Sequence, residues 1–214
     1  MDLEKIFNAG LSYQDYRELI NNLIAADKTT GNDQSSDLVN YTKLNVQRMN
    51  RIDKTVFLSP QEVEEAGQHD KDFRWLLIGD AWCGDCAQII PVIHKVVEAT
   101  KGKVQLRIVS RDTFPELIEE FTTNGSKSTP KLIVLDGNAY NAVLTTWGSR
   151  PEPAHQIMLD WKAHQNTITW DDFEKNLHLW YTKDKGATTI KELLQVLKIA
   201  QKEQAGINEN LPMQ

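Results

Sequence analysis

The sequence predicts an α/β fold in which helices flank a central mixed β-sheet, with further helices at both ends of the chain. Between residues 73 and 148, short apolar runs of strand length alternate with segments whose apolar residues recur at helical spacing. Before and after this region the patterning is helical. The 214 residues are somewhat long for one domain and short for two. We divide them into an N-terminal helical extension (1–58), a sheet-containing domain (59–150) and a C-terminal helical extension packed on that domain (151–214).

The N-terminal region is expected to form helices. Leucine, isoleucine and tyrosine recur at helical spacing over residues 11–27, and Ser12 stands where an N-cap is needed. After a polar loop, a second helix is expected over residues 37 to about 49. Ser59-Pro60-Gln61-Glu62 combines a cap, a proline at the first helical position and a glutamate three residues after the cap. A third helix should therefore run from there to about His69.

The central region is expected to supply the mixed sheet. Helical crossovers make its early strands parallel, and a hairpin at Asp136-Gly137-Asn138 adds an antiparallel pair. Asp112 and Thr113 are capping candidates for a short helix. The expected elements are, in order, a strand (73–79), a helix (83–100), a strand (104–109), a short helix (114–122) and two strands (131–135 and 140–147). Three helices should follow, over residues 151–165, from 169 or 171 to 181, and over 189–204.

Composition limits the function classes. Hydrophobic residues make up 40% of the chain and charged residues 25%, with a net charge of −6. No dense block of lysine and arginine is present, so non-specific nucleic-acid binding is disfavoured. The first residues lack a basic segment followed by an apolar signal core, and no stretch approaches the roughly 20 apolar residues of a membrane span. We therefore expect a cytoplasmic protein without a nucleic-acid or membrane partner.

Both cysteines of the chain lie in Ala81-Trp82-Cys83-Gly84-Asp85-Cys86, between a predicted strand and a predicted helix. Two thiols leave little room for a disulfide framework or a four-cysteine metal site, and His94 is badly placed to complete a zinc site. A thiol at a helix start lies among unpaired N–H groups at the positive end of the helix dipole, which favours the thiolate. This predicts Cys83 as a nucleophile and Cys86, one turn further on, as the resolving thiol. Two inert core thiols are the alternative.

The motif Trp82-Cys83-Gly84-Asp85-Cys86 resembles the active site of the thioredoxin family, in which the middle pair is usually Gly-Pro. Three more matches follow in order: Pro91 inside the helix, Thr129-Pro130 before a strand, and Gly148 after the last strand. The resemblance covers residues 73–150 and implies a thioredoxin-like fold. It also implies a cis-proline loop facing the cysteines, where the Thr129 backbone and Gly148 form a groove for an extended substrate peptide. The layout is similar to a bacterial branch with flanking helices.

Acidic residues mark the departures from the family pattern. The family's buried acid falls on Leu77, while Asp80 and Asp85 stand close to the cysteines instead. These acids are either surface residues that favour a helix start, or groups that tune the thiols. In the second case a carboxylate raises the pKa of Cys83, which predicts a reductant.

Two further motif residues have alternative interpretations. Trp82 either shields the cysteines or simply packs, and Gly84 either allows a tight turn into the helix or is purely structural.

The expected function is a cytoplasmic thiol–disulfide oxidoreductase, more a disulfide reductase than an oxidant. The Cys83–Cys86 dithiol carries the electrons, so we expect no organic cofactor or metal. Its partners would be a disulfide-containing protein or a small-thiol substrate, and an external electron donor such as a reductase or a low-molecular-weight thiol. Two alternatives stay open: a non-catalytic protein-binding module, and an enzyme acting on small thiol adducts or peroxides.

Overall fold

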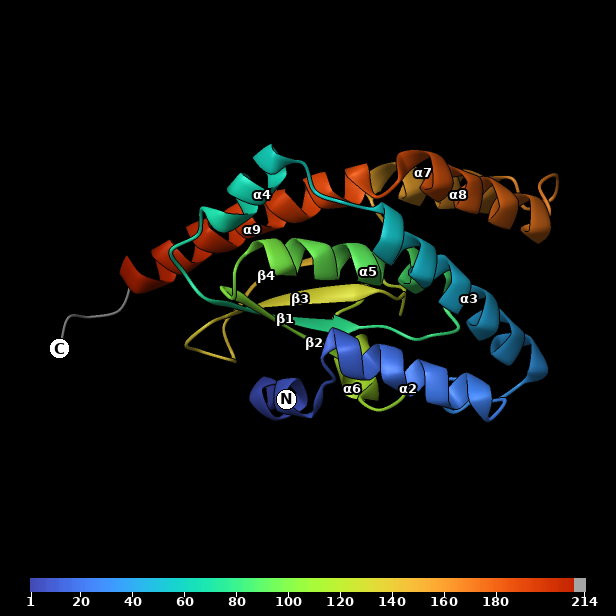
Figure 1. Ribbon diagram of the computed structural model, residues 1–214, viewed down its shortest axis with the longest axis horizontal. Helices are drawn as coiled ribbons and strands as arrows, with labels where there is room; N and C mark the ends of the chain where they lie inside the picture. Colours follow the sequence, from blue (N-terminus) through green and yellow to red (C-terminus); the bar gives the residue numbers. More distant parts are fainter. Residues whose placement is uncertain (210–214) are drawn as a thin grey trace.

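The computed structural model describes residues 1–209, and only the backbone of residues 207–209. Its described part contains a sheet in the order β2-β1-β3-β4, enclosed by helices on both faces (Figure 1). The strands are β1 (Phe73–Ile78), β2 (Val104–Val109), β3 (Lys131–Asp136) and β4 (Val143–Gly148). β1 pairs in parallel with β2, whereas β3 is antiparallel to both β1 and β4. The expected mixed sheet is confirmed, including the parallel first pair and the antiparallel hairpin.

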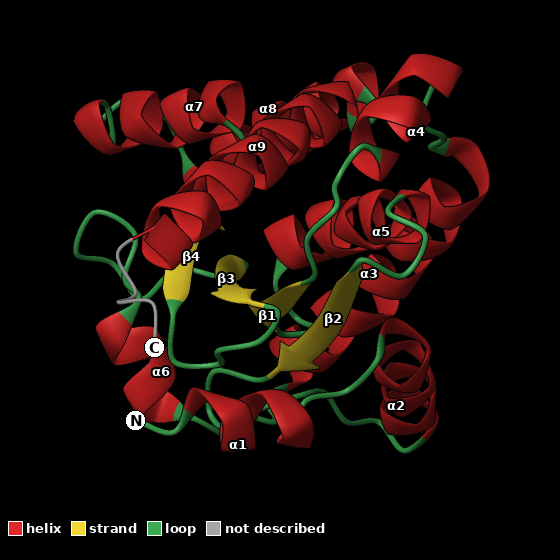
Figure 2. Ribbon diagram, turned by 90° about the vertical axis from the view of Figure 1, so that its left-hand side faces the viewer, coloured by secondary structure: helices red, strands yellow, loops and turns green. Residues whose placement is uncertain are grey.

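Each face of the sheet buries a separate apolar cluster because side chains alternate along a strand. Leu76 and Ile78 pack against the side on which α1 (Leu3–Ala9) and α6 (Pro115–Glu120) lie. Trp75 and Leu77 face the larger cluster. The other helices, shown in red around the sheet in Figure 2, are α2 (Tyr13–Ala25), α3 (Ser36–Thr55), α4 (Pro60–Gly67), α5 (Gly84–Ala99), α7 (Glu152–Ala163), α8 (Trp170–Asp184) and α9 (Ala187–Glu209).

Several helix starts match their sequence signals. The Ser12 side chain accepts a hydrogen bond from the backbone of Asp15 at the start of α2, and Ser59 and Glu62 form the expected capping box of α4. The Thr169 side chain accepts a hydrogen bond from the backbone N–H of Asp172 at the start of α8. These short-range hydrogen bonds satisfy backbone donors that the first helical turn leaves open. At these three helices, a serine or threonine followed by an acid three residues later marked the N-cap correctly.

Other sequence expectations were wrong in detail. Neither Asp112 nor Thr113 caps α6, which begins after Phe114 without a side-chain cap. The Asp112 carboxylate instead accepts a hydrogen bond from the backbone N–H of Asn32, 2.7 Å away. The hairpin loop is also longer than expected, because the Asp136 carboxylate accepts bonds from two successive backbone N–H groups and delays the start of β4 until Val143.

The terminal helices pack on the sheet or on other helices. α3 continues to Thr55, beyond the expected end near residue 49, because Ile52 is also buried in the larger cluster. α9 runs alongside β4 and α5 (Figure 1). Residues 210–214, the end of the predicted C-terminal extension, lie outside the described residues. Within residues 1–209, no helix has the length and apolar character to span a bilayer.

Candidate active site

The two thiols lie at the first turn of α5. Cys83 is the N-cap residue, and its Sγ accepts a hydrogen bond from the backbone N–H of Cys86 at 3.4 Å. The same sulfur donates to the carbonyl oxygen of Thr129, also at 3.4 Å. Cys83 is half-buried, whereas Cys86 is buried, and both are free thiols. Cys83 is thus the thiol that solvent reaches, as the sequence predicted.

The environment separates the acidities of the two thiols. Hydrogen bonding from Cys86 lowers the pKa of Cys83, although burial and the Asp85 carboxylate act in the opposite direction. Burial raises the pKa of Cys86 well above its usual value, and the neighbouring Cys83 adds to this effect. The expectation of a raised Cys83 pKa is therefore wrong, because hydrogen bonding from the Cys86 thiol outweighs both burial and the carboxylate.

Asp85 is a buried carboxylate with two polar partners. The residue is only 6% exposed, so the interpretation as a surface acid is wrong. One carboxylate oxygen accepts a hydrogen bond from the Tyr181 hydroxyl at 2.7 Å, and the other is ion-paired with the Arg150 guanidinium. A carboxylate in such a site needs these partners, because an unpaired charge away from water is costly. Asp85 thereby connects the cysteine motif to α8 and to the segment after β4.

Asp80 is buried completely on the other side of the motif. The Ser110 hydroxyl donates to one of its carboxylate oxygens at 2.6 Å. Its second oxygen and the Tyr16 hydroxyl are both buried, and neither has a hydrogen-bond partner within the described part of the chain. Burial raises the pKa of Asp80, and the Asp80 charge in turn raises the pKa of Cys86. Asp80 is therefore electrostatically linked to the buried thiol.

Trp82 and Gly84 complete the motif. Trp82 is half-buried, and the Arg111 guanidinium lies over its ring, 4.7 Å from the ring centroid. A Cβ on Gly84 would lie 3.0 Å from Cε1 of His178, tighter than ordinary van der Waals contact. The absence of a side chain at Gly84 thus allows α8 to approach the start of α5.

Thr129, Pro130 and Gly148 meet beside Cys83. The Thr129–Pro130 peptide bond is cis, and both residues are buried. The β3–β4 register pairs Lys131 with Gly148 and so brings Gly148 against the Pro130 carbonyl. Gly148 has φ of +112°, and a Cβ there would lie 2.5 Å from the Pro130 oxygen. Both the positive φ and this close approach require glycine.

We expect Gly148→Ala to be strongly destabilising. The alanine would add backbone strain and a clash with Pro130, so the free energy of unfolding should fall by at least about 2 kcal/mol in urea titrations. Gly125→Ala is the matched control, because Gly125 also has positive φ but nothing lies within 4 Å of an added Cβ. Equal losses in the two variants would show that the contact with Pro130 is unimportant.

Residues from the terminal helices form a hollow in front of Cys83. Its volume is ≈ 300 Å³, and it is lined by Trp82, Cys83, Gly84 and Asp85 together with side chains of α3 and α8 and Arg150. Thr129, Pro130 and Gly148 contribute nothing to this lining. The terminal helices therefore determine how a substrate approaches Cys83 from this side.

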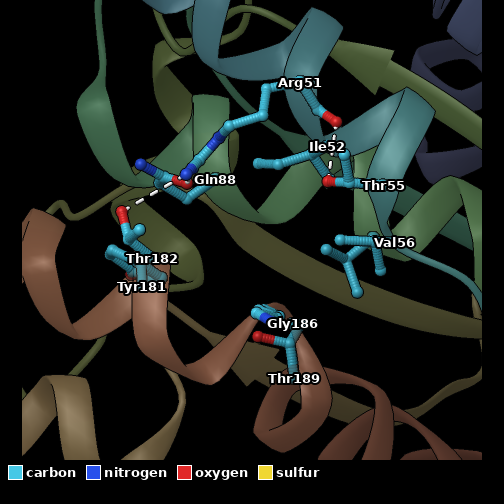
Figure 3. A pocket seen from close by; sticks show the side chains of 11 residues that line it. Arg51, Ile52, Thr55, Val56, Gln88, Tyr181, Thr182, Gly186 and Thr189 are labelled. Carbon is cyan, nitrogen blue, oxygen red and sulfur yellow. Dashed lines mark hydrogen bonds between the residues drawn. The ribbon is translucent and has the colours of Figure 1, made fainter.

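Hydrogen bonds attach α8 to α3 and α5. Figure 3 shows the side chain of Arg51, on α3, extending toward Gln88 and Thr182, to which it donates at 3.2 and 3.3 Å. His178 bonds the Gln88 amide through Nδ1 at 3.2 Å. Burial, together with neighbouring arginines, lowers the pKa of His178 to about 4, so its ring is neutral near pH 7.

Sequence reasoning missed the site residues that α8 and its neighbours supply. The sequence patterns assigned no role in the site to His178, Arg150 or Tyr181. A signal was present: Glu174, His178 and Tyr181 recur at the i, i+4, i+7 spacing of one helix face. Among residues 1–206, whose side chains the structure describes, no three histidine, cysteine, aspartate or glutamate side chains gather as a metal site would require.

Comparison with known proteins gives consistent matches. The sequence profile of the family described as Thioredoxin matches residues 31–169. A thioredoxin from Alicyclobacillus acidocaldarius subsp. acidocaldarius is 34% identical over 87 residues, which are 39% of this chain and 75% of that protein.

Two solved structures share the fold. One is an HIV epitope-scaffold, with a TM-score of 0.58 and 14% identity over 91% of this chain and 96% of the scaffold. The other, a protein of unknown function from Pseudomonas aeruginosa, has a TM-score of 0.57 and 14% identity over 90% of this chain and 94% of its own. At this identity the likeness concerns the fold alone, and it extends over most of the chain.

Proposed function

The chain belongs to the thioredoxin family, and from this premise we propose that Cys83 and Cys86 are the redox pair of a thiol–disulfide oxidoreductase. The lowered pKa of Cys83 removes the argument for a reductant from thiol acidity, so the proposed direction, disulfide reduction, rests on the reducing compartment in which we place the protein. The observation that carries the proposal is the asymmetry of the pair. Cys83 is half-buried and receives a helix-start N–H, while Cys86 is buried one turn behind it. A reactive thiol backed by a sheltered one is the arrangement that exchange requires.

The proposed reaction has two exchange steps. The Cys83 thiolate attacks one sulfur of a substrate disulfide, so a Cys83–substrate disulfide forms and the other substrate sulfur leaves as a thiolate that takes up a proton. Cys86 then loses its proton and attacks Cys83 Sγ, which releases the second substrate thiol. The substrate gains two electrons, and the protein is left with a Cys83–Cys86 disulfide.

The cycle needs an electron donor but no cofactor. An external dithiol or low-molecular-weight thiol would reduce the Cys83–Cys86 disulfide by the same exchange chemistry. We place this cycle in a reducing compartment such as the cytoplasm, where a dithiol is maintained in its active form. The two cysteines carry both electrons themselves.

The carboxylate of Asp80 is the proposed proton acceptor for Cys86. The buried thiol must lose its proton in the second step, and its pKa is raised well above the usual value. Asp80 is buried, has one carboxylate oxygen without a partner, and interacts electrostatically with Cys86. The position of the family's buried acid is occupied by Leu77, so Asp80 would perform this function from a different place on the chain.

We expect Asp80→Asn to slow the second exchange step by about ten- to a hundredfold, because the carboxylate that accepts the proton is lost. The pH profile of this step should lose the ionisation assigned to Asp80. The unfolding free energy at pH 7 should rise, since burial raises the pKa of Asp80 and so penalises its charged form in the folded protein.

This gain in stability should vanish as pH falls below the usual carboxyl pKa, where Asp80 is protonated in both states. Rapid acid quenching and urea titration measure the two effects. Ser110→Ala is the control: it removes a hydrogen bond to Asp80 but retains the carboxylate. An unchanged second step in Asp80→Asn would contradict the assignment.

Counting thiols in the native protein with a chromogenic aromatic disulfide tests the proposal against a non-catalytic module. We expect prompt reaction at Cys83, followed by closure of the Cys83–Cys86 disulfide and release of two equivalents of the coloured thiol. Two thiols that react only after denaturation would favour the module.

A further inference from the structure

The hollow in front of Cys83 has the size and lining of a small-molecule site. Its ≈ 300 Å³ lies at the lower end of the range of ligand pockets. Leu38 from α3 and Trp170, Phe173 and Leu177 from α8 supply an apolar wall opposite the thiol. An apolar group attached to sulfur would gain burial here while its sulfur contacts Cys83.

The wall is attached firmly to the redox motif. Tyr181 donates to Asp85 at 2.7 Å, and His178 is bonded to Gln88 at 3.2 Å. From α3, the Tyr41 hydroxyl donates to Glu174 at 3.2 Å. Because these bonds join α3 and α8 to the motif and to each other, they hold the apolar wall in place beside Cys83.

The polar end of the hollow carries both signs of charge. Arg150 is paired with Asp85, and Glu174 lies in the same lining. Arg48 lines an adjoining hollow that shares Glu174 and His178, and its Nη1 is 3.5 Å from the position of a Cβ on Gly84. Because positive and negative side chains lie close together here, the electrostatic potential favours an uncharged or zwitterionic ligand over one of high net charge.

We propose, on the basis of the oxidoreductase function above, that this hollow binds one half of a low-molecular-weight disulfide, and that small disulfides of uncharged or zwitterionic thiols are preferred over protein disulfides. The sulfur of the bound half lies at Cys83, and its carbon portion lies against the wall of α8. Cys83 attacks that sulfur, the other half leaves as a thiol, and Cys86 then releases the bound half. Two electrons pass from the protein dithiol to the small disulfide, and an external thiol restores them.

The test uses the pre-reduced full chain and two probes, bis(2-hydroxyethyl) disulfide and insulin. Protein thiols that remain after acid quenching are counted by mass spectrometry. We expect the rate with the small probe to saturate as the probe concentration rises, because binding in a pocket requires this. At low probe concentration, its second-order rate constant should exceed that for insulin by about a hundredfold per disulfide. Dithiodipropionate and cystamine, with two negative and two positive charges, should each react more slowly than the neutral probe after correction for their intrinsic reactivity.

A matched pair of substitutions on α3 tests whether the hollow is the binding site. Leu38→Trp fills it, while Leu44→Trp adds the same bulk at a position that is 43% exposed and outside its lining. We expect Leu38→Trp to lower the rate with the small probe by about tenfold or more, and Leu44→Trp to leave it unchanged. Equal effects in the two variants would overturn the proposal.

A second variant, Trp170→Ala, removes part of the apolar wall. It tests the proposal even if Leu38→Trp fails to fold. Trp170 is 49% exposed, so Trp170→Ala should fold, as circular dichroism can verify. Trp170→Ala should raise the concentration of the small probe that gives half of the maximal rate. It should also raise the rate with insulin relative to the rate with the small probe. Faster reaction with insulin than with the small probe in the unaltered protein would refute the substrate class while leaving the oxidoreductase intact. Failure of both probes to oxidise the thiols would instead refute the oxidoreductase function.

Discussion

Cys83→Ser is expected to abolish disulfide reduction, with a loss of at least about a thousandfold in rate, because a serine hydroxyl remains protonated near pH 7 and is a poor nucleophile toward disulfide sulfur. Reduction of a model disulfide by the pre-reduced protein measures this effect. The substitution should leave the fold intact, since Cys83 is a half-buried cap and a serine oxygen can accept the same N–H of Cys86.

Cys86→Ser is the matched variant for the second step. Its Cys83 should still attack, but the resulting mixed disulfide cannot be resolved within the molecule, so the substrate half should remain attached to Cys83. Mass spectrometry of the intact protein would detect the added mass, which must lie on Cys83 because it is the one cysteine left in this variant. Activity that survives in Cys83→Ser, or the absence of an adduct in Cys86→Ser, would assign the chemistry differently.

Asp85→Asn is expected to have the largest effect on stability. It would leave the Arg150 guanidinium buried without its ion pair, and the loss of one partner of such a pair costs about 3–5 kcal/mol of unfolding free energy. Removing the carboxylate should also lower the pKa of Cys83 further, because Asp85 acts to raise it. Urea unfolding and the pH dependence of Cys83 alkylation would measure the two effects separately.

Two comparisons make the effect of Asp85→Asn interpretable. Asp27→Asn removes the carboxylate of an exposed ion pair between Asp27 and Lys43. The Asp27 side chain is 81% exposed, so this substitution should change the unfolding free energy little. The double variant Asp85→Asn with Arg150→Met should be more stable than Asp85→Asn alone, because it no longer buries an unpaired charge. A Cys83 pKa that rises in Asp85→Asn would contradict the electrostatic effect assigned to this carboxylate.

Local patterns predicted much of the scaffold. Short apolar runs indicated the strands, two of which are buried along almost their whole length. The caps at Ser12, Ser59 and Thr169 depend on residues only three positions apart. The cysteine pair could be placed at the start of α5 for the same reason. The helix α1 was missed because it is only seven residues long, although Leu3, Ile6 and Phe7 do show helical spacing.

The environment of the site could not be predicted in the same way. Tyr181 lies 96 residues after Asp85 along the chain, so nothing close to the motif in sequence indicates that the carboxylate is buried. The same holds for the acidity of Cys83: the hydrogen bonding from Cys86 that lowers its pKa is a local feature, but the burial that opposes this effect comes from packing. Long-range contacts therefore determine the chemistry of a site whose location is encoded locally.

The most direct test of the central claim is equilibration of the protein with glutathione redox buffers, followed by acid quenching and alkylation of the remaining thiols. We expect Cys83 and Cys86 to be lost together over a single transition as the buffer becomes more oxidising, with an intramolecular disulfide as the product. Thiols that both remain reduced throughout, or a lasting glutathione adduct on Cys83 beside a reduced Cys86, would show that the two cysteines do not form a redox pair.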